Sequence, residues 1–97
     1  MITDITPEEF PYCAVYNYGY YREHQPDLDR AFGEDRTLYL RHFVEHGMKE
    51  GRKANPNFDV MVYRTQNPDL SEEFGDDLEK YFLHYIEKGQ MEKRKVF

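Results

Sequence analysis

The sequence predicts an all-α domain built from two tandem, pseudo-equivalent helical repeats. The chain aligns with itself without a gap at an offset that places Tyr63 on Tyr21. Apolar residues late in each copy recur at helical spacing, and residues that begin and end helices stand at the same places in both copies. Repeats of this length bury their apolar faces on one another. We therefore expect residues 1–97 to form one domain, with an N-terminal segment (1–15), repeat 1 (16–55) and repeat 2 (58–97).

Identical residues related by this offset carry most of the evidence for a repeat. They are rich in Pro, Gly, His and aromatic residues: Tyr21/Tyr63, Pro26/Pro68, Asp27/Asp69, Leu28/Leu70, Phe32/Phe74, Gly33/Gly75, Tyr39/Tyr81, His42/His84, Gly47/Gly89, Glu50/Glu92 and Arg52/Arg94. Chance does not align so many such residues in one register.

The clearest helix lies late in each copy. In repeat 2 the apolar residues follow the spacing of one helical face: Leu78, Tyr81, Phe82, Tyr85 and Ile86. Repeat 1 has the same stripe: Tyr39, Leu40, Phe43 and Val44. Asp76 or Asp77 is suited to cap the start of the repeat 2 helix, and Gly89, like Gly47, stands where a left-handed C-terminal cap would end it.

Two shorter segments precede this helix in each copy. One is a helix that Asn67 is suited to cap, with Pro68 first and Gly75 at its end; its counterparts in repeat 1 are Gln25, Pro26 and Gly33. The other, residues 16–24 and 58–66, fits a helix or a strand. We favour the helix, because an isolated strand would need a partner that nothing else in the chain supplies.

The segments outside the repeats have simpler patterns. Thr6 to Glu9 has the sequence of a capping box, and Pro11 is expected to stop that helix. Residues 53–57 are expected to form the hinge between the copies. The first ten residues lack the basic and apolar regions of a secretory signal. Cys13, the sole cysteine, excludes an internal disulfide and is interpreted as a small buried residue.

The net charge of the chain indicates which classes of partner are disfavoured. Thirteen basic residues against nineteen acidic ones give a net charge of −6, which disfavours the phosphate backbones of nucleic acids. Charged residues make up 33% of the chain, and its apolar runs are far shorter than the roughly 20 residues that a membrane-spanning helix needs. We therefore expect neither nucleic acid nor membrane as a partner.

A longer pattern runs through repeat 2: Phe58, Asp59, Tyr63, Asn67 to Leu70, Phe74 to Asp76, Tyr81, His84, Tyr85, Gly89, Glu92 and Arg94. Repeat 1 matches it from Tyr16 to Arg52. The pattern resembles a tandem repeat of secreted bacterial proteins, found in cell-surface proteins and beside cell-wall hydrolase domains. The resemblance implies a non-catalytic accessory module outside the cell, with no established ligand. Lys93 stands where repeat 1 has Gly51, so the final turn is expected to differ.

The residues shared by the two copies are interpreted as structural: Leu28, Phe32, Tyr39, His42, Gly47, Leu70, Phe74, Tyr81, His84 and Gly89. A zinc site needs three or four suitably spaced ligands, which the histidines do not offer. We expect His42 and His84 to make a repeated bond, for example to a loop carbonyl, and we predict no metal or cofactor. The pairs Glu50/Arg52 and Glu92/Arg94 are interpreted as ion pairs that fix the turn between repeats.

Positions that differ between the copies are better candidates for binding. Tyr18 and Tyr20 stand where repeat 2 has Val60 and Val62, so the common fold does not require tyrosine there. A tyrosine combines a flat apolar ring with a polar tip, which suits interfaces and sugar stacking. The alternative is that both rings fill core space beside the N-terminal segment.

Three function hypotheses follow. The leading one is a non-catalytic binding or spacer module of a bacterial surface or cell-wall-associated protein, which contacts cell-wall glycan or another protein. The second is an intracellular, cytoplasmic protein-interaction domain that can self-associate as a homodimer. The third is a small enzyme or metal protein that uses His42 and His84. The sequence offers no clear nucleophile beside a tuned acid or base, so we predict that the chain is not an enzyme.

Overall fold

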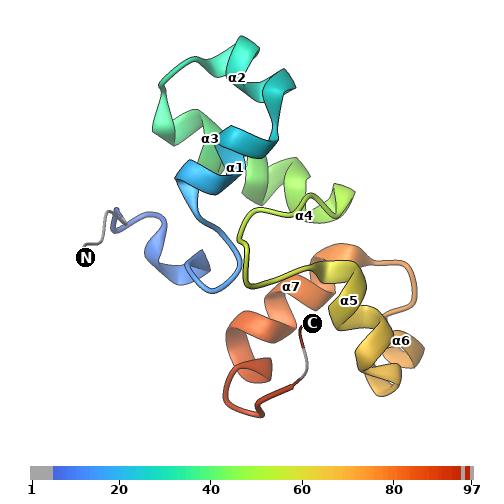
Figure 1. The fold of residues 1–97 in the computed structure, drawn as a ribbon. Coiled ribbons are helices and arrows are strands. Elements are labelled where there is room, and N and C mark those ends of the chain that lie inside the picture. Colours follow the sequence, from blue (N-terminus) through green and yellow to red (C-terminus); the bar gives the residue numbers. More distant parts are fainter. Residues whose placement is uncertain (1–5, 95, 97) are drawn as a thin grey trace.

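The computed structural model describes residues 6–94 and residue 96, and its regular elements are helical throughout, as predicted (Figure 1). The α-helices are α1 (Tyr18–His24), α2 (Pro26–Phe32), α3 (Arg36–His42), α4 (Met48–Glu50), α5 (Val60–Gln66), α6 (Pro68–Phe74) and α7 (Leu78–His84). A 3-10 turn, η1 (Phe10–Tyr12), precedes them. Two π-helical turns, η2 (Phe43–Gly47) and η3 (Tyr85–Gly89), extend α3 and α7. The bounds of α1, α2, α3 and η2 recur 42 residues later in α5, α6, α7 and η3.

The opening segment of each copy is a helix, and a side-chain cap explains why. The Asn17 side chain accepts a hydrogen bond from the backbone N–H of Tyr20 at 2.8 Å, and the Asp59 side chain accepts one from Met61 at 3.0 Å. Each cap satisfies a backbone donor that the first helical turn leaves free. The strand alternative for these segments is therefore wrong.

The caps predicted for the later helices are wrong in detail. Asn67 and Asp77 precede α6 and α7, but neither side chain bonds to the helix start. The Asn67 amide instead donates to the Tyr63 carbonyl at 2.8 Å and accepts from Arg94 at 3.1 Å. Pro68 at the first helical position needs no donor partner, so α6 can begin without a side-chain cap.

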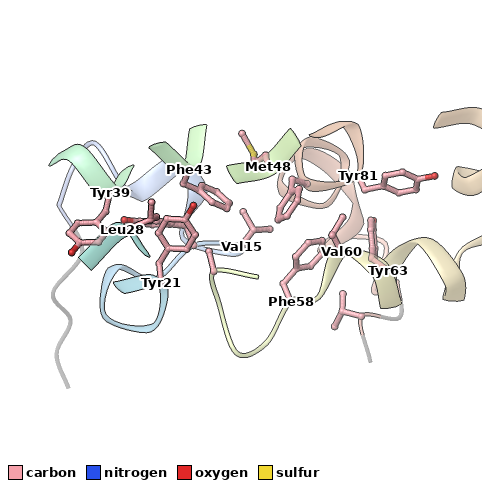
Figure 2. Close-up of a cluster of buried hydrophobic side chains, with 14 of the residues drawn as sticks. Val15, Tyr21, Leu28, Tyr39, Phe43, Met48, Phe58, Val60, Tyr63 and Tyr81 are labelled. Carbon is pink, nitrogen blue, oxygen red and sulfur yellow. The ribbon is translucent and has the colours of Figure 1, made fainter. Parts of the chain in front are cut away.

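The helices form two groups that share one core. Helices α1, α2 and α3 pack on one another, α5, α6 and α7 do the same, and α4 lies against α7 and joins the groups (Figure 1). The Phe43 and Phe82 rings meet edge to face across this junction, with centroids 5.5 Å apart. Buried apolar side chains run without interruption from one group to the other (Figure 2): Val15, Tyr16, Tyr21, Leu28, Tyr39, Phe43, Met48, Ala54, Phe58, Val60, Tyr63, Leu70, Tyr81, Phe82 and Val96.

The segment between the copies is pinned to the fold. Ala54 is fully buried and forms an isolated parallel bridge with Tyr16, and its carbonyl accepts a hydrogen bond from the Asn17 backbone at 2.7 Å. The Asn55 side chain donates to the Cys13 carbonyl at 3.2 Å. Residues 53–57 are therefore anchored to residues 13–17, and their role as the hinge between the copies stays a prediction.

The N-terminal segment folds over the outer side of α3. Thr6 and Glu9 exchange backbone-to-side-chain hydrogen bonds in both directions, which is the capping box that the sequence predicts. The Glu9 carboxylate is buried and makes two bonds of 2.7 Å with the Arg36 guanidinium. No helix in the described part of the chain has the length and apolar character needed to cross a membrane.

Candidate functional site

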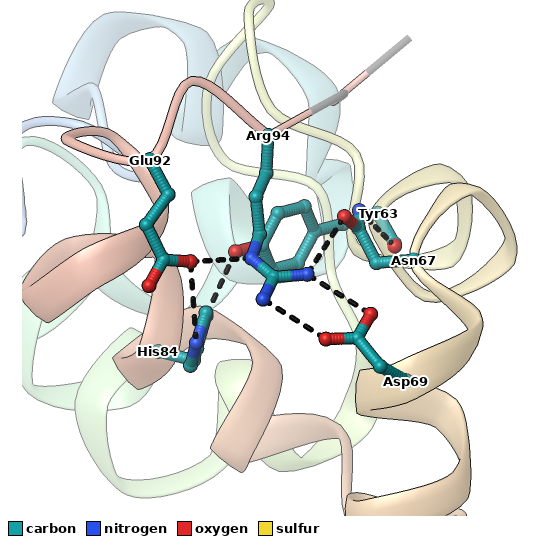
Figure 3. Close-up of polar contacts among 6 residues, drawn as sticks. All are labelled: Tyr63, Asn67, Asp69, His84, Glu92 and Arg94. Atoms are coloured by element: carbon teal, nitrogen blue, oxygen red, sulfur yellow. Dashed lines mark hydrogen bonds and ion pairs between the residues drawn. The ribbon is translucent and has the colours of Figure 1, made fainter.

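A polar cluster built around a histidine recurs in both halves of the molecule. His42 Nδ1 lies 2.9 Å from the Tyr21 hydroxyl, and His84 Nδ1 lies 2.8 Å from the Tyr63 hydroxyl (Figure 3). Burial raises the pKa of Tyr63 to about 12 and also raises that of Tyr21, so both phenols stay protonated near neutral pH. Each histidine thus makes the same bond in its own half, with a buried hydroxyl as the partner in place of the loop carbonyl given as an example.

Gly47 and Gly89 are glycines because these tyrosines come so close. A Cβ on Gly47 would lie 2.5 Å from the Tyr21 hydroxyl, and a Cβ on Gly89 would clash with the Tyr63 hydroxyl. Gly47 has a helical φ of −59°, and neither glycine has a positive φ. Their predicted role as left-handed caps is therefore wrong. Gly51, with φ of 72°, occupies that conformation instead.

An arginine at the end of each half closes the same cluster. The Arg94 guanidinium contacts Asp69 at 2.9 and 3.0 Å, and it also contacts Glu92 and Asn67 (Figure 3). Arg52 binds the counterparts of these residues: Asp27, Glu50 and Gln25. The arginine hydrogen bonds hold the pKa values of the aspartates and glutamates below their usual range. The predicted Glu–Arg ion pairs are present, and each arginine chiefly ties the end of its half to the second helix of the same half.

The remaining shared residues hold the second and third helices together. The hydroxyls of Tyr39 and Tyr81 each donate to the carbonyl of the glycine that ends the preceding helix, at 2.6 Å in both cases. Phe32 lies edge to face with Tyr39, and Phe74 with Tyr81, with ring centroids 5.3 Å apart. Leu28 and Leu70 are buried in the shared core. All of these residues contribute to packing within the chain.

Tyr18 and Tyr20 lie two positions apart in α1, and their rings contact different neighbours. Tyr18 lies edge to face with Tyr39, and the Arg36 guanidinium sits 4.6 Å from the centre of its ring. Tyr20 stacks on His24 with centroids 3.9 Å apart. Residues two apart in a helix point roughly 200° away from each other. The two tyrosines therefore belong to separate surfaces, and their role in binding stays a prediction.

A groove of about 400 Å³ opens beside α3, where the N-terminal segment crosses it. Leu40 and Val44, both half-buried, form its apolar floor. Charged and polar side chains border it: Thr6, Glu8, Glu9, Arg36, Thr37, Arg41 and Glu45. An apolar floor with a polar border is a composition that protein interfaces and small-molecule pockets share.

The same face of the other half is covered by the chain itself. At the 42-residue offset, Leu40 and Val44 correspond to Phe82 and Ile86. The Phe82 ring packs on those of Phe43 and Phe58, and α4 lies against α7. Met48 of α4 is 1% exposed and belongs to the core that both halves share. Among the described residues, the groove beside α3 is therefore the counterpart of a surface of α7 that packs against the rest of the chain.

Sequence reasoning did not identify this groove. Leu40 and Val44 belong to the predicted core stripe, and their half-buried side chains pack against the core. Upstream of repeat 1, the same offset aligns Thr6 with Met48 and Glu9 with Gly51. These pairs share no chemistry, so the register gave no reason to extend the repeat before Tyr16.

Among the described residues, no group of three or more His, Cys, Asp and Glu side chains could hold a metal ion. Comparison of the chain with protein-family models, with curated proteins and with solved structures gave no match.

Proposed function

We propose that the chain is a non-catalytic helical-repeat binding module that holds a protein partner in the groove beside α3. The observation that carries this proposal is the groove itself, whose counterpart on α7 packs against Phe43 and Phe58 of the same chain. Burying an apolar side chain on a surface with Leu40 and Val44 at its floor removes water from both and lowers the free energy of the complex.

The recurring polar residues support a binding role over catalysis. His42 and His84 each bond to a buried tyrosine, and Arg52 and Arg94 each bond to carboxylates of their own half. Groups that make the same intrachain contact twice serve the fold in both places. By resemblance, the partner belongs to a bacterial cell surface or wall, and we favour a protein over a glycan because the groove floor is aliphatic.

The test compares two threonines of similar setting. Thr37 is exposed on α3 and borders the groove, whereas Thr65 is exposed on α5 and does not line it. Thr37→Arg places a long cationic side chain over the groove, and Thr65→Arg makes the same change elsewhere. Resin-bound wild type, Thr37→Arg and Thr65→Arg are incubated with bacterial surface proteins and, separately, with purified cell-wall glycan.

We expect a surface protein to be retained by wild type and by Thr65→Arg and lost from Thr37→Arg. Circular dichroism must show that all three chains are folded. Equal retention by both variants, or retention on glycan alone, would contradict the proposed groove.

A further inference from the structure

We infer that mild acid loosens the first half of the molecule before the second, through the two histidines His42 and His46 beside the junction of the halves. The element that responds is the stretch from η2 to α4, and α4 packs on both η2 and α7. Such a response is independent of what the groove beside α3 binds. It depends on a difference between two clusters whose helices otherwise correspond along the chain.

The Tyr21 hydroxyl ties α1 to η2 through an acceptor that acid removes. It lies 2.9 Å from His42 Nδ1, and a Cβ on Gly47 of η2 would lie 2.5 Å from it. His42 is the only hydrogen-bond partner of this hydroxyl among the described residues, so the phenol donates and the neutral imidazole accepts. A protonated imidazole has a hydrogen on both ring nitrogens and accepts nothing. The buried hydroxyl then lacks an acceptor, which destabilises the contact.

Burial and neighbouring cations oppose the protonation of His42. Burial is the main cause that lowers its pKa, and the Arg52 guanidinium and the His46 imidazole act in the same direction. The rings of the two histidines lie with their centroids 5.5 Å apart. The Glu50 and Asp27 carboxylates favour the charged form, but both already pair with Arg52. Two imidazoles that become charged at this distance repel each other, and local opening relieves the repulsion.

The second half gives its histidine different neighbours. The Glu92 carboxylate lies 4.0 Å from His84 Nε2, which is the distance of an ion pair once the imidazole is protonated (Figure 3). Among the described residues, no carboxylate comes that close to His42. Lys88 stands at the counterpart of His46, and a lysine gains no charge between neutral and mildly acid pH. Protonation therefore adds an attraction in the second half and a repulsion in the first.

The stretch from η2 to α4 connects the first cluster to the contact between the halves. Phe43 of η2 meets Phe82 with ring centroids 5.5 Å apart, and Met48 of α4 is buried in the shared core. The turn that acid deprives of its bond to Tyr21 is thus the turn that holds the junction. Local opening of this stretch precedes unfolding of the whole chain, because proteins open in units of unequal stability.

The experiment measures amide hydrogen exchange in η2 and η3, two turns of equal length at corresponding places. Each rate is divided by that of an unstructured peptide at the same pH, at about pH 7.5 and about pH 5, on either side of the ordinary histidine pKa. An opening that takes up one proton lowers protection by at most about tenfold per pH unit. We expect protection on acidification to fall at least about threefold more in η2 than in η3.

Two pairs of variants locate the cause. His46→Gln removes one imidazole and should shrink the difference between η2 and η3, whereas His24→Gln, at an exposed histidine on α1, should keep it. Glu92→Gln keeps an oxygen for Arg94 but cannot form an ion pair with His84, so η3 should become acid-sensitive. Glu87→Gln, at an exposed carboxylate of η3, is the matched control and should leave η3 as in wild type.

Equal loss of protection in η2 and η3 at about pH 5, including unfolding of the whole chain in one step, would overturn the inference. The same holds for a larger loss in η3. A His46→Gln chain with the wild-type difference would show that the pair is not the cause, and an equal change in His24→Gln would assign the effect to charge in general. Either result also overturns the inference.

Discussion

The first half meets its N-terminal neighbour through an ion pair between Arg36 and Glu9, whereas the second half meets α4 through an apolar contact between Leu78 and Gly51. The helices beneath these contacts have the same order and the same spacing. A helical unit can therefore keep its internal structure while its outer face changes chemistry. The residues that agree between the halves hold the unit together, and those that differ set what it packs against.

The surface ion pairs support the same reading. Arg22 pairs with Asp29 on α2, whereas its counterpart Arg64 pairs with Asp76 in the turn before α7, each at 2.7 Å. Ser71 occupies the position that corresponds to Asp29 and has no carboxylate. Arg64 therefore pairs with Asp76 instead. Exposed pairs of this kind contribute little to stability. The unit therefore depends on its buried contacts, and these are where the two halves can be compared most sharply.

The largest effect is expected from the buried tyrosines of α3 and α7. Tyr39→Ala and Tyr81→Ala should each lower the free energy of unfolding by about 3–5 kcal/mol, the usual cost of removing a large buried aromatic. Both rings are fully buried and make the same bond to a glycine carbonyl, so the two costs should agree. Urea denaturation measures them, with the Tyr→Phe variants as controls for the hydroxyl. Costs that differ several-fold would break the equivalence of the halves.

A second comparison uses the close approach of tyrosine to glycine. Gly47→Ala and Gly89→Ala should each cost about 1–3 kcal/mol, because the added methyl group meets a buried hydroxyl that is already bonded to histidine. Gly19→Ala is the matched control, since its Cβ would meet only Asn17 Oδ1 at 3.5 Å and alanine favours the helix. Thermal melts of the three variants decide the question. A stabilising Gly47→Ala would show that the glycine serves another purpose.

Gly47 and Gly89 show which features of the fold could be predicted from the sequence and which could not. The helices and their common offset were predictable, because apolar spacing and turn residues are local signals. A glycine at the end of an apolar stripe, however, fits a left-handed cap and a close approach equally well. The two possibilities can be distinguished only by where the ring of Tyr21 or Tyr63 lies, and these residues are distant from the glycines in the sequence.

The same reason explains the other errors. Asn67 has the ideal character of a helix cap, but Arg94, 27 residues further on, takes its side-chain oxygen. The groove depends on the N-terminal segment that crosses α3. Residues 6–9 of this segment share no chemistry with residues 48–51, to which they correspond at the 42-residue offset. Local sequence patterns therefore could not predict contacts between residues that lie far apart in the sequence.

A third comparison concerns Tyr16, whose counterpart is Phe58. The Tyr16 hydroxyl is buried and has no hydrogen-bond partner in the described part of the chain, and burial raises its pKa. Tyr16→Phe should raise the free energy of unfolding by about 1–3 kcal/mol, the penalty of an unsatisfied buried donor. The reciprocal Phe58→Tyr should lower it. Loss of stability in Tyr16→Phe would mean that the hydroxyl contributes a favourable interaction.

A smaller effect is expected at the final turn. Lys93 has φ of 55°, the conformation that its counterpart Gly51 adopts as glycine. Lys93→Gly should stabilise the chain by about 1 kcal/mol, because left-handed backbone is strained for a residue with a side chain. Lys93→Ala keeps this strain and should leave the stability nearly unchanged. Equal melting temperatures for Lys93→Gly and Lys93→Ala would exclude backbone strain as the difference between the two turns.

The smallest effect, and the one that tests the histidine cluster directly, is a dependence on pH. Burial is the main cause that lowers the pKa of His42, with Arg52 and His46 acting in the same direction and the Glu50 and Asp27 carboxylates against it. The unfolded chain, with a histidine pKa of about 6.5, therefore binds a proton more readily than the folded chain. Stability should be fully present above about pH 6.5 and should fall as the pH is lowered through that value.

Urea denaturation between about pH 7.5 and about pH 5 measures this slope in wild type and in His42→Gln. Glutamine offers the Tyr21 hydroxyl a polar partner but cannot titrate, so the variant should lose part of the slope whatever its overall stability. The comparison rests on the change with pH, because any fixed cost of the substitution cancels. The same slope in both chains, or a wild type that gains stability on acidification, would show that burial of the neutral imidazole is not what sets the proton affinity of this cluster.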